Sequence, residues 1–178
     1  LLFYRGQLAA QDGADFATAI EAVKRRNVSL GEFIDRFTRV VKMPAPEPRQ
    51  VQLKDMVDDI LWLNREQCAS RGIRLGWRRC DPVPGVALYA QLIEGALLNI
   101  VKNAIEAVTA RQAAGIAGGH VEFALERVGG EAVLAVLDSA DLLGAAPRQL
   151  FTPFFSTKQG GQGIGLMFVR EVLLRHGF

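Results

Sequence analysis

Two asparagines one helical turn apart are the first residues in this sequence whose type and spacing suggest chemistry. Asn99 and Asn103 lie in LLNIVKNAIEAV (97–108), and on a helix they fall with Glu106 within about 60° of one another. Apolar residues cover most of the remaining circumference. Asparagine is a poor helix former because its side chain competes with the backbone for hydrogen bonds. Its amide oxygen suits Mg²⁺, which keeps water and phosphate among its ligands. This face is therefore either a ligand-binding face or a polar face exposed to solvent.

A second group of candidate residues starts at Asp138 and continues into FTPFFSTKQGGQGIGL (151–166). Asp138 follows the apolar stretch EAVLAVL, where a carboxylate either accepts a hydrogen bond from the amino group of a base or caps a turn. Clustered glycines allow the backbone to approach a ligand closely, and at a helix start they leave N–H groups free to bind phosphate. A dinucleotide fingerprint would directly follow a strand. Here the glycines follow a long irregular stretch, 138–163, which is typical of a functional loop.

A long helix is predicted over residues 13–43. Its apolar positions recur in alternating steps of four and three, which indicates a heptad seam that packs in a helix bundle or dimer, or else on its own domain. Pro44, Pro46 and Pro48 end the helix because proline donates no helical hydrogen bond, and MPAPEPRQ is typical of a short, stiff linker. The seam consists of Phe16, Ile20, Val23, Asn27, Leu30, Ile34, Phe37 and Val41.

The remaining chain is predicted to mix helices with strands. A helix begins at Leu53 and ends at a cap formed by Arg71 and Gly72. Two further helices are predicted over 91–113 and 163–175. Strands are predicted over 73–80, 121–128 and 131–137, and the last two flank a Gly-Gly pair that signals a hairpin. Helices combined with an antiparallel hairpin make this an α+β fold.

Composition limits the classes of protein that remain. The 178 residues are 49% hydrophobic and 22% charged, which suits about one domain with a helical extension. A net charge of +2 is too mild to indicate nucleic acid as a partner. No apolar run is long enough to span a membrane, and the N-terminus is no signal peptide. Two cysteines and two histidines do not make a metal site, and reduced thiols indicate a cytoplasmic protein. A chain that starts without Met and stops at Phe178 is expected to be a fragment.

The motifs together are more specific than any one of them. Asn-x3-Asn-Ala, a strand-terminal Asp and FTPFFSTK…GQGIGL resemble the ATP-binding domain of sensor histidine kinases of two-component systems. Their fold is the Bergerat (GHKL) fold of gyrase, Hsp90 and MutL-type ATPases, with helices packed on a mixed sheet. The sequence is most similar to a nitrogen-regulation-like subgroup. The helix through FIDRFTRVVKMPAPEP resembles the second helix of the dimerisation and histidine-phosphotransfer hairpin. The resemblance implies that residues 1–49 are part of that region and 50–178 an ATP-binding domain, truncated at its C-terminus.

The same resemblance assigns roles to individual residues. It implies that Asn103 coordinates Mg²⁺ on the phosphates of ATP, that Asn99 lines the same site, and that Asp138 binds the adenine amino group. It also implies an ATP lid that Lys158 extends toward the phosphates. The lid glycines that cradle phosphate are Gly161, Gly163 and Gly165. Its aromatic anchors are Phe151, Phe154 and Phe155.

The implied activity is transfer of phosphate from ATP to a histidine, and then to an aspartate of a response regulator. Related ATPases carry a glutamate base where this chain has Asn99, so the resemblance favours phosphotransfer over hydrolysis. The implied partners are a second copy, joined through the N-terminal helical region, and a response regulator receiver domain. Neither His120 nor His176 lies in the acceptor motif, so the acceptor is expected upstream of Leu1. Any membrane contact would come from parts outside this chain.

One departure from the family pattern supports an alternative. The Asp-x-Gly-x-Gly box reads Asp138-Ser139-Ala140-Asp141-Leu142, so Ala140 and Leu142 replace both glycines. The alternative is a degenerate, non-catalytic module that binds nucleotide structurally and dimerises through its long helix. A serine-directed anti-sigma kinase has the same fold but lacks that helix.

Overall fold

The computed structural model describes residues 47–140, 151 and 165–178, together with the helical positions 16, 18–24, 27–28 and 31. The chain divides into two compact units, Leu1–Met43 and Pro44–Phe178. In the first unit every described residue is helical, as predicted, and Phe16, Ile20 and Val23 of the predicted seam are exposed. The seam positions Leu30, Ile34, Phe37 and Val41 lie outside the described residues.

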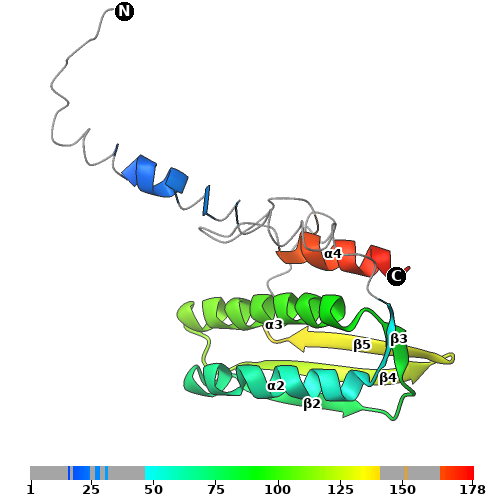
Figure 1. Cartoon of the computed structure of the whole chain (residues 1–178). Helices are drawn as coiled ribbons and strands as arrows, with labels where there is room; N and C mark the ends of the chain where they lie inside the picture. Colours follow the sequence, from blue (N-terminus) through cyan, green and yellow to red (C-terminus); the bar gives the residue numbers. More distant parts are fainter. Residues whose placement is uncertain are drawn as a thin grey trace, which may run out of the picture. The chain divides into compact units, whose positions relative to one another are not determined.

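The second unit places helices against a mixed sheet (Figure 1). Three strands pair in the order β2-β4-β5, with β2 parallel to β4 and β4 antiparallel to β5. Two short strands, β1 and β3, form a separate antiparallel pair. The predicted α+β class, with helices packed on a mixed sheet, is confirmed. The elements are β1 (Arg49–Val51), α2 (Leu53–Ser70), β2 (Arg74–Cys80), β3 (Val86–Leu88), α3 (Ala90–Ala113), β4 (His120–Val128), β5 (Glu131–Asp138) and α4 (Gly165–Arg175).

The core lies between α2, α3 and the central strand β4. Val121, Phe123 and Leu125 alternate along β4 and are fully buried, whereas Glu122 and Glu126 point to the other face of the sheet. The helices contact the buried face, and α4 packs on α3. The helix residues that complete this core are Val57, Ile60, Val101, Ile105, Val108, Val169 and Val172.

Helices α2, α3 and α4 all end in the same hydrogen-bonding motif. At the end of α2 the Gly72 N–H donates to Ala69 O at 3.1 Å and the Ile73 N–H donates to Cys68 O at 2.9 Å. This pair of bonds defines a Schellman cap. The residue that follows the cap residue, here Gly72 with φ 63°, has a left-handed backbone that glycine adopts without steric cost. The predicted stop at Arg71 and Gly72 is confirmed. Gly115 and Gly177 serve α3 and α4 in the same way.

The β-hairpin also forms where the sequence predicted it. Val128 pairs with Glu131, and the intervening Gly129 and Gly130 have φ angles of 58° and 91°. Two positive φ values in a two-residue loop define a type I′ turn, whose twist matches that of the strands. The sequence analysis missed β1 and β3, which are three residues each and too short to show alternation. Strand β1 begins within the stretch interpreted as a linker.

A charged hydrogen-bond cluster ties α2 to β2. The Trp77 indole N–H donates to Asp58 Oδ1 at 2.8 Å, and Lys54, one turn earlier on α2, pairs with the other carboxylate oxygen. The hydrogen bonds from Lys54 and then Trp77 hold the pKa of Asp58 below its usual value. Stability from this carboxylate is therefore present above its unfolded-state pKa and is lost as pH falls through the folded-state pKa.

We therefore predict that Asp58→Asn lowers the free energy of unfolding at pH 7 by about 1 kcal/mol, since a charged hydrogen bond becomes a neutral one. The Asp58 side chain is 40% exposed, so solvent screening limits the effect. Urea denaturation followed by circular dichroism at pH 7 and pH 3 measures it, and the difference from wild type should shrink at pH 3. Asp59→Asn, an exposed neighbour on the same helix, is the control. A difference that stays constant with pH would contradict this role for the Asp58 charge.

Candidate functional site

The Asn99 side chain is hydrogen-bonded to the backbone of its own helix, α3, and its amide oxygen points away from that helix. Asn99 Nδ2 donates to the carbonyl oxygen of Gly95 at 2.8 Å. Because a carbonyl oxygen only accepts, the bonded side-chain atom must be the amide nitrogen, and this assigns the orientation of the amide. The amide oxygen Oδ1 is left facing the start of α4, where a Cβ added at Gly165 would lie 3.2 Å from it.

Asn103, the second asparagine, also lies next to Gly165. The same Cβ position lies 3.7 Å from Asn103 Nδ2, so both amides flank the first residue of α4. The first backbone N–H groups of a helix have no partner within the helix and form its positive end. The structure therefore brings two half-buried amides together with the N-terminus of α4, an arrangement suited to an anion and its metal ion.

The contact is set by close packing of α4 on α3 further along both helices. The ring of Phe168 packs over Gly95 of α3, where an added Cβ would meet two ring carbons at an ordinary contact distance of 3.5 Å. At the other end of α4, His176 Nε2 accepts the Tyr89 N–H at 3.1 Å, and its Nδ1 lies 2.7 Å from Val172 O. With Nε2 as the acceptor from Tyr89, Nδ1 is the ring nitrogen that donates to Val172 O. The contacts of Phe168 and of His176, which follows α4, thereby hold α4 against α3 and its N-cap residue Tyr89.

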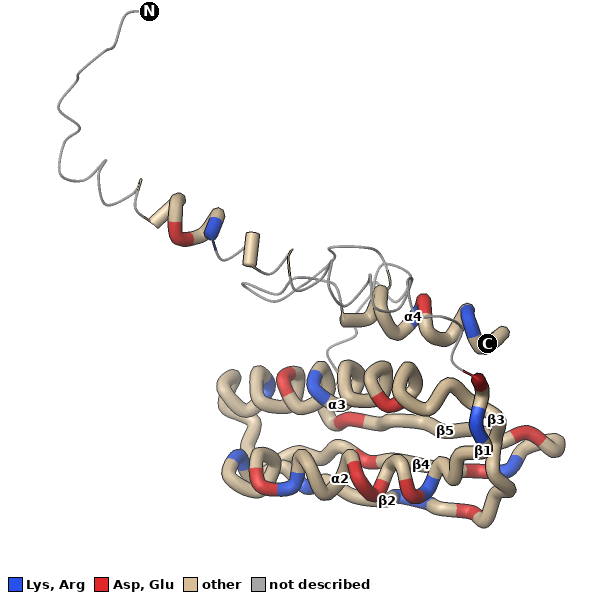
Figure 2. The backbone as a smooth tube through the Cα atoms, in the orientation of Figure 1, with Lys and Arg blue, Asp and Glu red and all other residues tan. Residues whose placement is uncertain are grey.

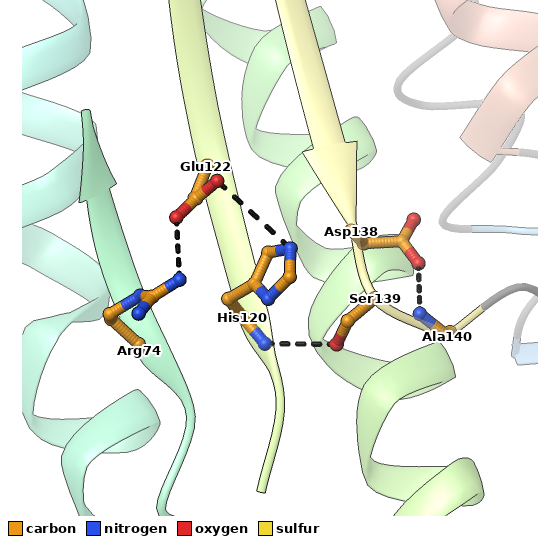
Figure 3. A network of polar contacts seen from close by, with 6 residues as sticks. All are labelled: Arg74, His120, Glu122, Asp138, Ser139 and Ala140. Carbon is orange, nitrogen blue, oxygen red and sulfur yellow. Dashed lines mark hydrogen bonds and ion pairs between the residues drawn. The ribbon is translucent and has the colours of Figure 1, made fainter. Parts of the chain in front are cut away.

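Asp138 lies at the end of β5 on the helix-covered face of the sheet. It is directly opposite Val121, which is fully buried beneath the helices, and directly opposite residues of an antiparallel pair point to the same face. Its Oδ1 accepts the Ala140 N–H at 2.8 Å (Figure 3). Asp138 itself remains exposed, so its carboxylate is accessible to a ligand on the α3 side of the sheet.

The turn after Asp138 is held firmly against neighbouring backbone. Ser139 Oγ accepts the His120 N–H at 2.9 Å, and the Ser139 N–H donates to His120 O at 3.1 Å (Figure 3). Gly119, with φ +151°, sits so close to Val108 of α3 that a Cβ would overlap it. These contacts lock the end of β5 beside α3. Ala140, at the first replaced glycine of the box, is 4% exposed.

The structure thus brings together Asn99, Asn103 and Gly165, and places Asp138 on the same side of the sheet. The other predicted lid residues, Lys158, Gly161, Gly163, Phe154 and Phe155, lie outside the described residues. Phe151 is described and 40% exposed.

Sequence analysis missed the roles of Gly95, Phe168 and His176. Of these, Gly95 alone carried a signal in the sequence, because a glycine inside a helix is unusual. Within the part of the chain that the structure describes, no three His, Cys, Asp or Glu side chains gather as metal ligands. No helix among the described residues is long and apolar enough to cross a membrane.

Comparison with protein families and curated proteins gives consistent results. Residues 89–178 match the family described as histidine kinase-, DNA gyrase B- and HSP90-like ATPase. Nitrogen regulation protein NtrY of Azorhizobium caulinodans is 25% identical over 173 residues, covering 97% of this chain and 22% of NtrY. Sensor histidine kinase ZraS of Salmonella typhimurium is 30% identical over 151 residues, covering 83% of this chain and 31% of ZraS. The chain therefore spans less than a third of either relative.

Solved structures show the same fold. Full-length ShkA in complex with AMPPNP superposes with a TM-score of 0.68 at 21% identity, covering 97% of this chain and 35% of that one. Histidine kinase ThkA in complex with the response regulator TrrA gives a TM-score of 0.60 at 19% identity, covering 78% of this chain and 40% of that one. At these identities the likeness establishes the fold.

The space at Gly165 leads to a direct prediction. In Gly165→Ala the new Cβ displaces the Asn99 amide or the start of α4, which should weaken binding of a fluorescent ATP analogue roughly three- to tenfold. Gly95→Ala is the matched control, because its Cβ meets Phe168 at an ordinary contact distance. It should leave the affinity unchanged and raise the free energy of unfolding by about 0.5–1 kcal/mol through better helix propensity. Equal affinities in the two variants would show that the contact at Gly165 does not shape the site.

Proposed function

Because the chain belongs to the histidine kinase-, DNA gyrase B- and HSP90-like ATPase family, we propose that it is the cytoplasmic kinase core of a two-component sensor histidine kinase. It binds Mg-ATP and transfers the γ-phosphoryl group to a histidine of a dimerisation region, from which a response regulator aspartate takes it. The observation that carries the proposal is the convergence of Asn99, Asn103 and the N-terminus of α4 on one place.

The residues around Gly165 fit a metal-bound triphosphate. Asn103 would offer its amide oxygen to Mg²⁺, the kind of hard oxygen ligand this ion prefers. When bound, Mg²⁺ neutralises charge on the phosphate oxygens. The first backbone N–H groups of α4 would donate to the phosphates, and Gly165 leaves them accessible because it has no side chain. Asn99 would line the same site with its free oxygen.

The remaining roles follow from the family resemblance together with position. Asp138, exposed at the end of β5, would accept a hydrogen bond from the adenine amino group. Lys158 would approach the phosphates from the lid, and Gly161 and Gly163 would let the lid close over them. A site with amides and a helix N-terminus on one side and a carboxylate on the other distinguishes the phosphate end from the base end of a nucleotide.

The chemistry of Asn99 favours phosphotransfer to a protein over hydrolysis. An amide has no basic group that could take a proton from water, and the Asn99 nitrogen is already bonded to Gly95 O. In the proposed step an imidazole nitrogen forms a bond to the γ-phosphorus while the bond to the ADP oxygen breaks. ADP leaves and the imidazole releases its N–H proton. Catalysis is then mainly positioning and charge neutralisation.

The acceptor and the partners lie beyond the described nucleotide-binding unit. His176 has both ring nitrogens engaged, which makes it a poor acceptor. The heptad seam of residues 13–43 supports a homodimer, in which the acceptor histidine belongs to the same helical region. The solved complex of ThkA with TrrA supports a response regulator receiver domain as the next partner.

Titration with a fluorescent ATP analogue, with and without Mg²⁺, tests the binding step. Asn103→Ala removes the amide oxygen and should weaken binding in Mg²⁺ by at least about tenfold, as expected for a metal ligand. Without Mg²⁺ the difference from wild type should be smaller. Asn64→Ala is the control, since Asn64 is also a half-buried helical asparagine but lies on α2. Binding that does not saturate, or that is insensitive to Asn103→Ala, would remove this function.

The buried Ala140 favours a second candidate, a non-catalytic module of the same fold. A methyl group stands where the family pattern has a glycine, close to Asp138 and with 4% exposure. Such a site would retain nucleotide without transferring phosphate, and the protein would act through dimerisation alone.

A chain extended upstream through the expected acceptor histidine distinguishes the two candidates. Incubation with γ-labelled ATP should give acid-labile, base-stable phosphate on the protein, because phosphohistidine has this stability. Asn103→Ala in the extended chain should abolish the label. Saturable nucleotide binding without any label, in a folded extended chain, would instead identify the non-catalytic module.

A further inference from the structure

A cleft lies between α2 and the strand β2, at the edge of the domain remote from the residues assigned to nucleotide. Its volume is ≈ 360 Å³, which is within the range of ligand-binding clefts. None of Asn99, Asn103, Asp138 or Gly165 lines it. The residues that do are mainly apolar and include Leu61, Trp62, Arg65, Cys68, Ile73 and Leu75.

Trp62 and its neighbour Leu63 make this surface unusual. Trp62 is 77% exposed and Leu63 is 61% exposed, although both are large apolar side chains. Scattered exposed apolar residues are normal, but an exposed tryptophan at the rim of an apolar cleft is typical of interaction sites. Burial raises the pKa of the Cys68 thiol, so the floor of the cleft stays uncharged.

Three arginines, of which Arg65 alone lines the cleft, form what we call its basic rim. Residues 61–75 contain three arginines, Arg65, Arg71 and Arg74, against the single acidic residue Glu66. Figure 2 shows basic residues gathered at the end of α2 and the start of β2. Arg74 donates to Glu122 at 2.9 Å and Arg71 donates to Thr109 at 3.3 Å, while Arg65 lines the cleft itself.

The arginines of the edge strand β2 favour binding of a different, acidic protein over pairing with a second copy of this chain. Among the described strands β2 pairs only with β4, so it borders the cleft with an open edge. Arg74 and Arg78 along β2, together with a register shift at Trp77, discourage pairing of two identical edges because like charges would meet. The same charges attract an acidic chain.

We propose that this cleft binds an acidic segment of a partner protein. An apolar anchor side chain of the segment inserts between Trp62 and the Ile73–Leu75 wall, and its carboxylates face Arg65. Interfaces of this kind concentrate their binding energy in tryptophan and arginine. Attraction between the basic rim and the acidic segment speeds their encounter and falls with added salt.

A peptide library displayed on phage and selected on the full chain tests the proposal. The selected peptides should combine Asp or Glu with an aromatic or leucine anchor. Synthetic copies should lose roughly tenfold or more in affinity in Trp62→Ala and in Arg65→Ala. Leu63→Ala is the matched control, since Leu63 is also a large, exposed apolar residue but does not line the cleft. It should leave affinity within about twofold. Asn103→Ala should also leave peptide binding unchanged, which keeps the result independent of the nucleotide site.

Each other outcome would overturn the assignment. Selected peptides without an acidic bias, or with equal affinity for Trp62→Ala and wild type, would exclude this cleft as their site. Self-association in the ultracentrifuge that disappears in Trp62→Ala would identify a second copy as the occupant. Binding to phosphatidylserine vesicles that depends on Trp62 would identify a membrane surface instead. Circular dichroism checks that each variant is folded, which is expected because Trp62 is exposed.

Discussion

The contact between the start of α4 and the polar face of α3 is the constraint on which the candidate site depends. Helix α3 buries its apolar residues against the sheet while two of its amides, Asn99 and Asn103, stay half-buried beside the start of α4. This is possible because Gly165 has no side chain to cover them, with its Cβ position only 3.2 Å from Asn99 Oδ1. A Cβ there would require the amide or the start of α4 to shift by a few tenths of an ångström, because 3.2 Å is tighter than an ordinary contact in a close-packed interior.

The rest of the second unit maintains this contact. Phe168 against Gly95 fixes the middle of α4, and the bond between His176 and the Tyr89 N–H fixes its end. The sheet orients Asp138, the other predicted site residue. Because Asp138 pairs with Val121, its carboxylate lies on the helix-covered face of the sheet. Ala140, which precedes the predicted lid, is held by its hydrogen bond to Asp138, and Gly165, which follows the predicted lid, lies beside Asn99.

Local sequence signals predicted the long elements and failed on the short ones. The helices α2 and α3 and the β4–β5 hairpin carry periodicity, capping glycines or a Gly-Gly turn, all of which act within a few residues. Strands β1 and β3 have three residues each, and their pairing depends on a partner far along the chain. The bond from Tyr89 to His176 is equally non-local, so nothing in a single sequence indicates it. The Asn99–Asn103 face was predictable from spacing, whereas its contact with Gly165 was not.

Hydrogen bonding within a helix does not by itself identify a functional asparagine. Asn64 on α2 and Asn99 on α3 both donate to the carbonyl four residues earlier, each at 2.8 Å. This bond compensates for the poor helix propensity of asparagine and serves a structural role equally well. What sets Asn99 apart is the direction of its remaining oxygen, which faces the first residue of α4 beside a second amide. The proposed function therefore rests on the convergence of three residues from two helices, which the fold supplies, more than on the residue type.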